Sequence, residues 1–170
     1  HLRVIGVDPP CRASFMQQIG ELSLRPEVSI HNIMAFGNIA YVADGDSGLQ
    51  VVDLSNPESP SILGSVDTPG YALDVAVSGS LAYVADEFFG LQVIDVSDPA
   101  SPTILGHLET GGIVTAVAVA GALVYISDSA DGIQVIDMSN PSAPRIQGHG
   151  DTPGSSLDVA ISGAEVFVAD

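Results

Sequence analysis

Short apolar runs, separated by turns rich in Gly and Pro, follow one another along the chain. They are clearest in the middle, at residues 72–78, 81–86, 91–97 and 103–109. Runs of this length, rich in Val, Ile, Leu and Tyr, are too short for helices and favour β-strands. Pro99 and Pro102 interrupt the pattern where a sheet ladder would need an N–H donor that proline lacks. The pattern therefore predicts four antiparallel strands in one small sheet, with the more polar fourth run at its outer edge.

This pattern recurs every 42 residues. The step relates the aromatic positions Tyr41, Tyr83, Tyr125 and Phe167, and the acidic positions Asp44, Asp86, Asp128 and Asp170. A period of about 40–45 residues with four strands per unit is typical of a β-propeller blade. We therefore expect an all-β protein made of four-stranded antiparallel blades. A single domain over residues 1–170 would hold about four units, approximately 2–44 (degenerate), 45–86, 87–128 and 129–170.

Two arrangements of these units are open. The chain begins in the third strand of one unit, since residues 2–7 match 91–96 with Gly6 in place of Asp95, and it ends after the second strand of another. Residues 166–170 would close a four-bladed ring if they paired beside residues 2–7. Blades of this length usually form larger rings, which favours an arc of a larger propeller. An open arc would expose apolar faces at both ends, so we expect it to oligomerise or aggregate.

Three segments carry a family resemblance. Leu-Gln-Val-Val-Asp at 49–53, Leu-Gln-Val-Ile-Asp at 91–95 and Ile-Gln-Val-Ile-Asp at 133–137 resemble the LVIVD repeat. The resemblance covers residues 28–170 well and residues 1–27 poorly, where Gly6 and a longer loop at 8–18 depart from the pattern. It implies a β-propeller in a secreted or cell-surface protein. The family has no known catalytic residues, so the resemblance carries none to this chain.

The charge of the chain is strongly negative. It has 21 acidic residues, four Arg and no Lys, which gives a net charge of −17. This balance argues against a nucleic-acid partner and against an anionic membrane surface. No apolar stretch approaches the roughly 20 residues that a membrane helix needs, so we expect no membrane insertion. An acidic chain instead favours a cation or a basic partner.

Many of the carboxylates fall on loops that a propeller places on one face. The loops between the second and third strands hold Asp44, Asp46, Asp86, Glu87, Asp128 and Asp131. The loops between blades, on the same face, add Asp67, Glu109 and Asp151. Calcium takes 6–8 oxygen ligands, so the first set is a candidate calcium site. The alternative is that the repeated strand-end aspartates cap the backbone, and their presence in every unit favours it.

Three further groups stand out on the strands and loops. Tyr71, Phe88 and Phe89 lie near the same phase of the repeat and could form an apolar partner-binding patch, or could cover the top of the junction between blades. Asp53, Asp95 and Asp137 lie in the third strands, where we expect structural hydrogen bonds to a neighbouring strand or turn. Asp74 and Asp158 begin the innermost strands, near the mouth of the channel.

No set of non-equivalent polar residues converges as a catalytic site would. We therefore expect a non-catalytic scaffold that binds a protein or carbohydrate partner through its acidic loop face. Calcium is the candidate cofactor. The alternative is a calcium-dependent propeller hydrolase or lyase acting through the rim carboxylates.

Overall fold

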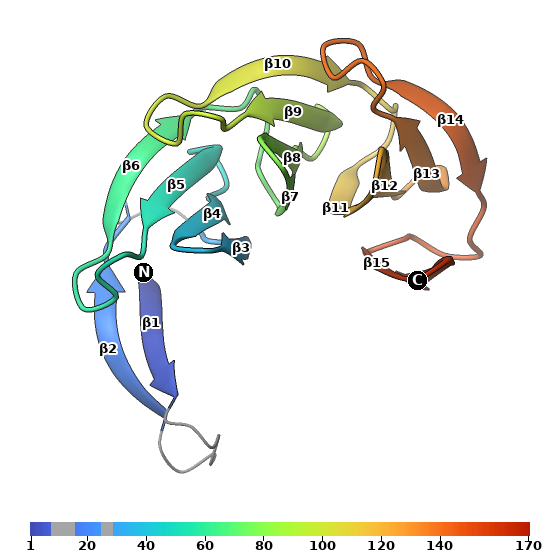
Figure 1. Cartoon of the computed structure of the whole chain (residues 1–170). Coiled ribbons are helices and arrows are strands. Elements are labelled where there is room, and N and C mark those ends of the chain that lie inside the picture. The colour runs from blue at the N-terminus through green and yellow to red at the C-terminus, as the bar shows by residue number, and fades with distance from the viewer. Residues whose placement is uncertain (8–15, 25–28) are drawn as a thin grey trace.

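The computed structural model describes residues 1–7, 16–24 and 29–170, with the side chains of 4–7 and 16–19 left aside. The described chain is all β and contains sixteen strands in five antiparallel sheets (Figure 1). No described helix has the length and hydropathy needed to cross a membrane. The long loop expected at residues 8–18 lies largely outside the described residues.

Three of the sheets are complete four-stranded blades whose strands pair in chain order. The first contains β3 (Asn32–Phe36), β4 (Ile39–Ala43), β5 (Leu49–Asp53) and β6 (Ser61–Val66). The second contains β7 (Asp74–Ser78), β8 (Leu81–Ala85), β9 (Leu91–Asp95) and β10 (Thr103–Leu108). The third contains β11 (Val114–Ala120), β12 (Leu123–Asp128), β13 (Gly132–Asp137) and β14 (Arg145–Gly150). The predicted strands 72–78, 81–86, 91–97 and 103–109 are therefore confirmed, each within two residues at its ends.

The remaining two sheets are hairpins at the ends of the chain. One pairs β1 (Leu2–Val7) with β2 (Met16–Leu22), and the other pairs β15 (Asp158–Ser162) with β16 (Glu165–Ala169). In the described residues β1 pairs only with β2 and β16 only with β15. The five sheets stand side by side in an open arc, with β3, β7, β11 and β15 on its inner side and the two ends apart (Figure 1). The described chain is thus a propeller arc and not the closed four-bladed ring.

The core lies between neighbouring sheets and not inside any one of them. Successive residues of a strand point to opposite faces, so each blade has one apolar face for the preceding sheet and one for the following sheet. In the second blade Val84 and Ile94 pack towards the first blade, whereas Tyr83 and Leu91 pack towards the third. This explains why the first three runs of every unit are apolar on both faces.

A register shift recurs between the third and fourth strands of all three complete blades. It lies between Val51 and Val52 in the first blade and between Val135 and Ile136 in the third. The pair β1–β2 shifts between Val4 and Ile5, the same place in the aligned strand. Because a bulge is a specific feature of backbone pairing, this identifies β1 and β2 as the third and fourth strands of a blade. The β1–β2 hairpin is therefore the outer half of a blade.

Candidate functional site

The loops between second and third strands contact the loops between blades, which puts both sets on one face. Gly45 and Ala72 form an antiparallel bridge between these two kinds of loop, and Glu87 and Val114 repeat it one blade on. Glu87 has a φ of 51°, the same value as Gly45 at the equivalent position. The left-handed backbone at this position is therefore a property of the loop, which accepts Glu despite its strain. We call this surface the loop face.

The strand-end aspartates are built into the loop face. Asp86 is fully buried, and its two oxygens accept hydrogen bonds from Thr68 Oγ1 at 2.6 Å and the Gly70 backbone N–H at 3.0 Å. Asp170 accepts the Gly154 N–H at 2.9 Å, which repeats the bond between Asp86 and Gly70 two repeats further along the chain. Burial raises the pKa of Asp86, against these hydrogen bonds, which favour the carboxylate. The aspartate thus joins the end of the second strand to the loop that enters its own blade.

Asp128 is equally buried but turns back into its own loop. Its Oδ1 accepts the Ala130 N–H at 2.9 Å and its Oδ2 accepts Gln134 Nε2 at 3.3 Å. A Cβ on Gly112 would lie 1.8 Å from Asp128 Oδ1, so this loop too depends on a glycine packed against the carboxylate. Asp44 is also buried. The capping role expected for these aspartates is what the structure shows for Asp86 and Asp128.

The exposed carboxylates gather in two equivalent places, which we call the acidic hollows. The first, of about 110 Å³, is lined by Asp46, Ser47, Gln50, Ser65 and Asp67. The second, of about 200 Å³, is lined by Asp131, Gln134, Ile146, His149 and Asp151. Each hollow combines one acid from a loop inside the blade with one from a loop between blades. The two sets of carboxylates predicted to share a face therefore meet in pairs.

The predicted metal set does not come together as one site in the described part of the chain. The described residues include no group of three or more His, Cys, Asp or Glu side chains arranged to hold a metal ion. Each hollow contributes two carboxylates, and His149 Nε2 lies 3.9 Å from Asp151 Oδ1 in the second. Calcium binding stays a prediction. Melting curves recorded with millimolar calcium and with EDTA test it, because a ligand specific to the folded state raises the melting temperature.

The predicted aromatic patch divides into a structural part and an exposed part. Tyr71 is half-buried, with its hydroxyl 3.2 Å from His31 Nε2 and the two rings edge to face at 5.0 Å. It covers Gly45, where a Cβ would lie 2.7 Å from the Tyr71 ring. Phe88 and Phe89 remain 66% and 46% exposed. Tyr71 therefore seals a junction between blades, and the two phenylalanines are the accessible apolar groups of the loop face.

The innermost strand holds a contact that sequence reasoning missed. Asp74 is buried, and its Oδ1 accepts the Val75 N–H while its Oδ2 accepts the Val117 N–H of the next blade, both at 2.8 Å. Burial raises the pKa of Asp74, and the nearby Asp158 carboxylate adds to the rise. Asp74 was predicted to lie near the channel mouth. Its hydrogen bond with Val117, 43 residues further along the chain, was not predicted, because it depends on how two blades pack against each other. The only signal in the sequence is that Asp158 repeats Asp74 at 84 residues.

The third-strand aspartates make local bonds. Asp53, Asp95 and Asp137 each accept the backbone N–H of the serine two residues later, at 2.7–2.8 Å. These hydrogen bonds to serine lower the pKa of all three carboxyls. The predicted bond to a turn is confirmed, and it closes the start of each Pro-containing loop.

Comparison with known proteins follows the same boundaries as the sheets. The LVIVD repeat model matches residues 29–68, 69–110 and 111–152, while no curated protein matches the chain. The crystal structure of the computationally designed Ika4 protein is similar, with 14% identity over 89% of this chain and 91% of that chain and a TM-score of 0.74. The computationally designed Ika8 protein has 13% identity over 90% of this chain and 46% of that chain, with a TM-score of 0.73. The chain thus spans about half of the Ika8 chain, and at these identities the likeness concerns the fold. The three matched repeats cover most of the sequence, and the chain therefore belongs to the LVIVD repeat family of β-propeller proteins.

Proposed function

We propose that this chain is a non-catalytic binding module whose loop face holds a basic segment of a partner protein. The observation that carries the proposal is the pairing of exposed carboxylates in the two acidic hollows of the first and third blades, together with the exposed Phe88 and Phe89 on the corresponding loop of the second blade. Carboxylates in a concave site raise the local concentration of cations, and aromatic side chains supply contact area. A secreted or cell-surface setting belongs to the proposal because the family resemblance implies it.

The two hollows suit side chains rather than a small substrate. Their volumes of about 110 and 200 Å³ fall below the roughly 300–1,000 Å³ that is typical of small-molecule sites. A Lys or Arg end group would fit beside two carboxylates, and the partly apolar wall formed by Ile146 would take its aliphatic stem. The hollows repeat 84 residues apart along the arc, which suits an extended partner with spaced basic residues.

The buried carboxylates support a non-catalytic role. Asp74 and Asp86 have raised pKa values, which are common in general acids, but backbone and hydroxyl donors hold both of their oxygens. A perturbed pKa can arise from a structural network as readily as from catalysis. These two groups perform a structural task that accounts for their burial.

Binding of a fluorescent lysine-rich peptide, measured by anisotropy at low and at physiological salt, tests the proposal. The double variant Asp131→Asn/Asp151→Asn should weaken binding by about five- to tenfold, because it removes the charge of one hollow. The matched control is Glu58→Gln/Glu165→Gln, which removes the same charge from the opposite face. Equal losses for the two variants would show that only net charge matters and would overturn the site.

Carbohydrate is the other partner expected from sequence, and a panel of uncharged oligosaccharides distinguishes it. Sugar binding that survives in Asp131→Asn/Asp151→Asn and is lost in Phe88→Ala/Phe89→Ala would replace the basic partner by a carbohydrate stacked on aromatic rings. If neither the peptide nor any sugar binds the wild-type chain, the loop face is not a binding surface of this kind.

A further inference from the structure

One glutamine of the third blade lacks a bond that its counterparts make. In the first and second blades, Nε2 of Gln50 and Nε2 of Gln92 each donate to the backbone carbonyl three residues earlier, at 2.9 and 3.1 Å. Gln134 occupies the same position of the repeat, but its Nε2 donates to Asp128 Oδ2 at 3.3 Å and to Asp131 Oδ2 at 3.4 Å. The change follows the loop sequence, since Asp131 supplies a carboxylate where the other two loops have serine and phenylalanine.

This arrangement leaves the oxygen of the Gln134 amide without a donor. Gln134 is only 2% exposed, and no donor among the described residues lies within hydrogen-bond distance of its Oε1. A buried acceptor with no donor costs free energy, and such groups are uncommon in native proteins unless another molecule completes them. Both bonds of Nε2 are long for N–H···O contacts, so the amide is weakly held and can turn about its last side-chain bond.

The same glutamine lines the larger of the two acidic hollows. It does so together with Asp131 and Asp151, both of which are exposed. The three side chains come from different elements, namely β13, the loop before it and the loop that follows β14. Two carboxylates alone would be an ordinary solvated surface. A buried acceptor that lacks a donor beside them indicates a place for a ligand that carries both positive charge and N–H groups.

The side of β13 that carries Gln134 faces the second blade. Alternate residues of a strand point to the same face, so Gln134 shares its face with Ile136. Ile136 packs in one cluster with Ala76 and Tyr83 of the second blade. The second blade therefore covers this side of the strand and still supplies no donor to Gln134 Oε1. The unpaired oxygen is a property of a packed junction between two blades.

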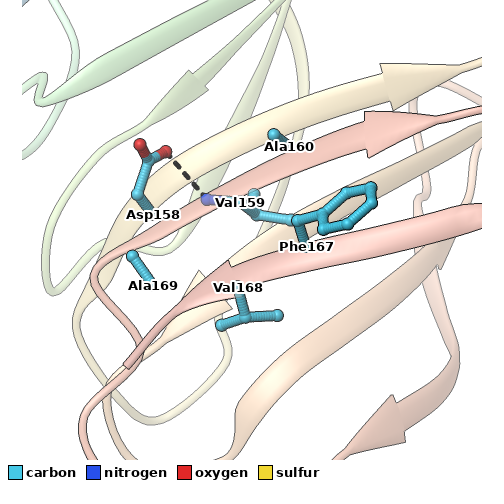
Figure 2. Close-up of a pocket in the computed structure, with 6 residues that line it drawn as sticks. All are labelled: Asp158, Val159, Ala160, Phe167, Val168 and Ala169. Carbon is cyan, nitrogen blue, oxygen red and sulfur yellow. Dashed lines mark hydrogen bonds between the residues drawn. The ribbon is translucent and has the colours of Figure 1, made fainter.

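The apolar hollow on β15–β16 is of another kind (Figure 2). It has a volume of about 230 Å³ and is lined by Asp158, Val159, Ala160, Phe167, Val168 and Ala169. The equivalent face of the second blade packs against the third, with Tyr83 only 4% exposed. The hollow in Figure 2 is therefore the face of a blade, and the Asp158 carboxylate on it already accepts the Val159 N–H at 2.8 Å.

We propose that the third-blade hollow binds an arginine of the basic partner segment, and that Gln134 selects arginine over lysine. This inference rests on the proposed function, which supplies the basic segment. A guanidinium has five N–H donors in one plane, so it can donate to Asp131, Asp151 and Gln134 Oε1 together. An ammonium has three donors on one atom and is more strongly hydrated, so it loses more hydration when it enters a hollow of this kind.

The two hollows differ in the way that this selection requires. The third-blade hollow has a volume of about 200 Å³, against about 110 Å³ for the first-blade hollow. Ile146 and the His149 ring line the larger one and offer surfaces on which a planar guanidinium stacks, whereas Ser47 and Ser65 line the smaller one. Gln50 keeps its bond to the backbone in the first blade. We therefore expect the first-blade hollow to accept either cation.

Anisotropy measurements with two labelled peptides test the selection. The peptides have equal length and charge, and one alternates arginine with glycine while the other alternates lysine with glycine. At physiological salt the 170-residue chain should bind the arginine peptide about tenfold more tightly, because only the guanidinium adds a charged donor to the buried acceptor. Gln134→Leu keeps the size of the side chain and removes the acceptor, so the two affinities should become equal. Gln50→Leu is the matched control and should leave their ratio unchanged.

The ratio between the two peptides separates selection from structural damage, since a folding defect in Gln134→Leu would weaken both peptides alike. Equal affinities in the wild-type chain would overturn the inference while the proposed binding of a basic segment stands. A preference for arginine that survives in Gln134→Leu, or that disappears equally in Gln50→Leu, would also overturn the role of Gln134. If the wild-type chain binds neither peptide, the proposed function fails and the inference fails with it.

Discussion

Asp86 is buried and accepts two donors of the inter-blade loop, so its removal should be costly. In Asp86→Ala the Thr68 hydroxyl and the Gly70 N–H lose their acceptor. Each buried unsatisfied group costs about 1–3 kcal/mol. The variant no longer has to bury a carboxylate, which offsets part of this cost. We therefore expect a net loss of about 3 kcal/mol in the free energy of unfolding. Chemical denaturation measures it. Asp46→Ala, on an exposed residue of the corresponding loop, should change stability by less than about 0.5 kcal/mol. Equal effects would contradict the assigned role of Asp86.

Acidification should act on two groups of aspartates with opposite sign. Asp53, Asp95 and Asp137 have lowered pKa values in the folded chain, so their contribution is full above the ordinary value of 3.8 and is lost as the pH falls below it. Asp74 and Asp86 have raised pKa values, so their ionisation costs stability as the pH rises from 3.8 through the raised values.

The two signs can be separated in melting experiments. The deficit in melting temperature of Asp95→Asn relative to wild type should shrink between pH 7 and about pH 2.5, because the wild-type carboxylate becomes protonated. The deficit of Asp74→Asn should grow over the same interval, because the neutral acid at position 74 relieves the burial of its charge. Parallel behaviour of the two variants would show that one or both assignments are wrong.

Single carboxylates also mark the limit of what the sequence predicts here. The 42-residue step located every strand-end aspartate and favoured capping over metal binding. It did not predict that Asp86 accepts a hydrogen bond from Thr68 whereas Asp128 accepts one within its own loop. The two loops differ in sequence, with Ala130 and Asp131 in place of Phe88 and Phe89, but this difference does not indicate which donor each carboxylate binds. The hydrogen bond between Asp74 and Val117 was equally unpredictable, since it depends on the packing of two blades.

The outer strands depend on a glycine that lets the next unit approach the sheet. A Cβ on Gly106 would lie 2.5 Å from the Pro141 carbonyl oxygen, so backbone must shift to admit it. We expect Gly106→Ala to cost about 1–3 kcal/mol in unfolding free energy. Gly148→Ala is the matched control and should cost little in the 170-residue chain, because a Cβ there would meet nothing within 4 Å. Urea titration of both variants gives the comparison. A similar loss at both positions would mean that the cost lies in the strand itself and not in the contact between units.

Strands were the most predictable level of this fold. Apolar periodicity placed β7 to β10 within two residues at each end, because β7 to β9 are short and buried on both faces and all four strands are bounded by Gly or Pro. The register shift between third and fourth strands was not predictable, because an extra residue in one strand looks the same as a longer strand. That shift nonetheless confirms the place of β1 in the third strand of a blade, which the match of residues 2–7 with 91–96 predicts.

The whole arc should differ in local stability from its middle to its ends. The second blade is covered on both faces, whereas no sheet follows β15–β16 in the described residues. Because local opening follows the number of buried contacts, amides near the ends of an isolated arc should exchange fastest. Hydrogen exchange of the 170-residue chain should therefore show slow amides in β8 and fast ones in β16, and equal rates in the two strands would contradict this expectation.

The free edge of β16 gives this expectation an atomic test. The Leu157 N–H donates to the Ala169 carbonyl at 2.8 Å, so Ala169 faces β15 and its neighbour Val168 faces the open edge. In the 170-residue chain the Val168 amide should therefore exchange quickly. The equivalent Val84 pairs with Gln92 of β9, so its amide should exchange slowly. Equal protection of the two amides would show that the outer edge of β16 is covered.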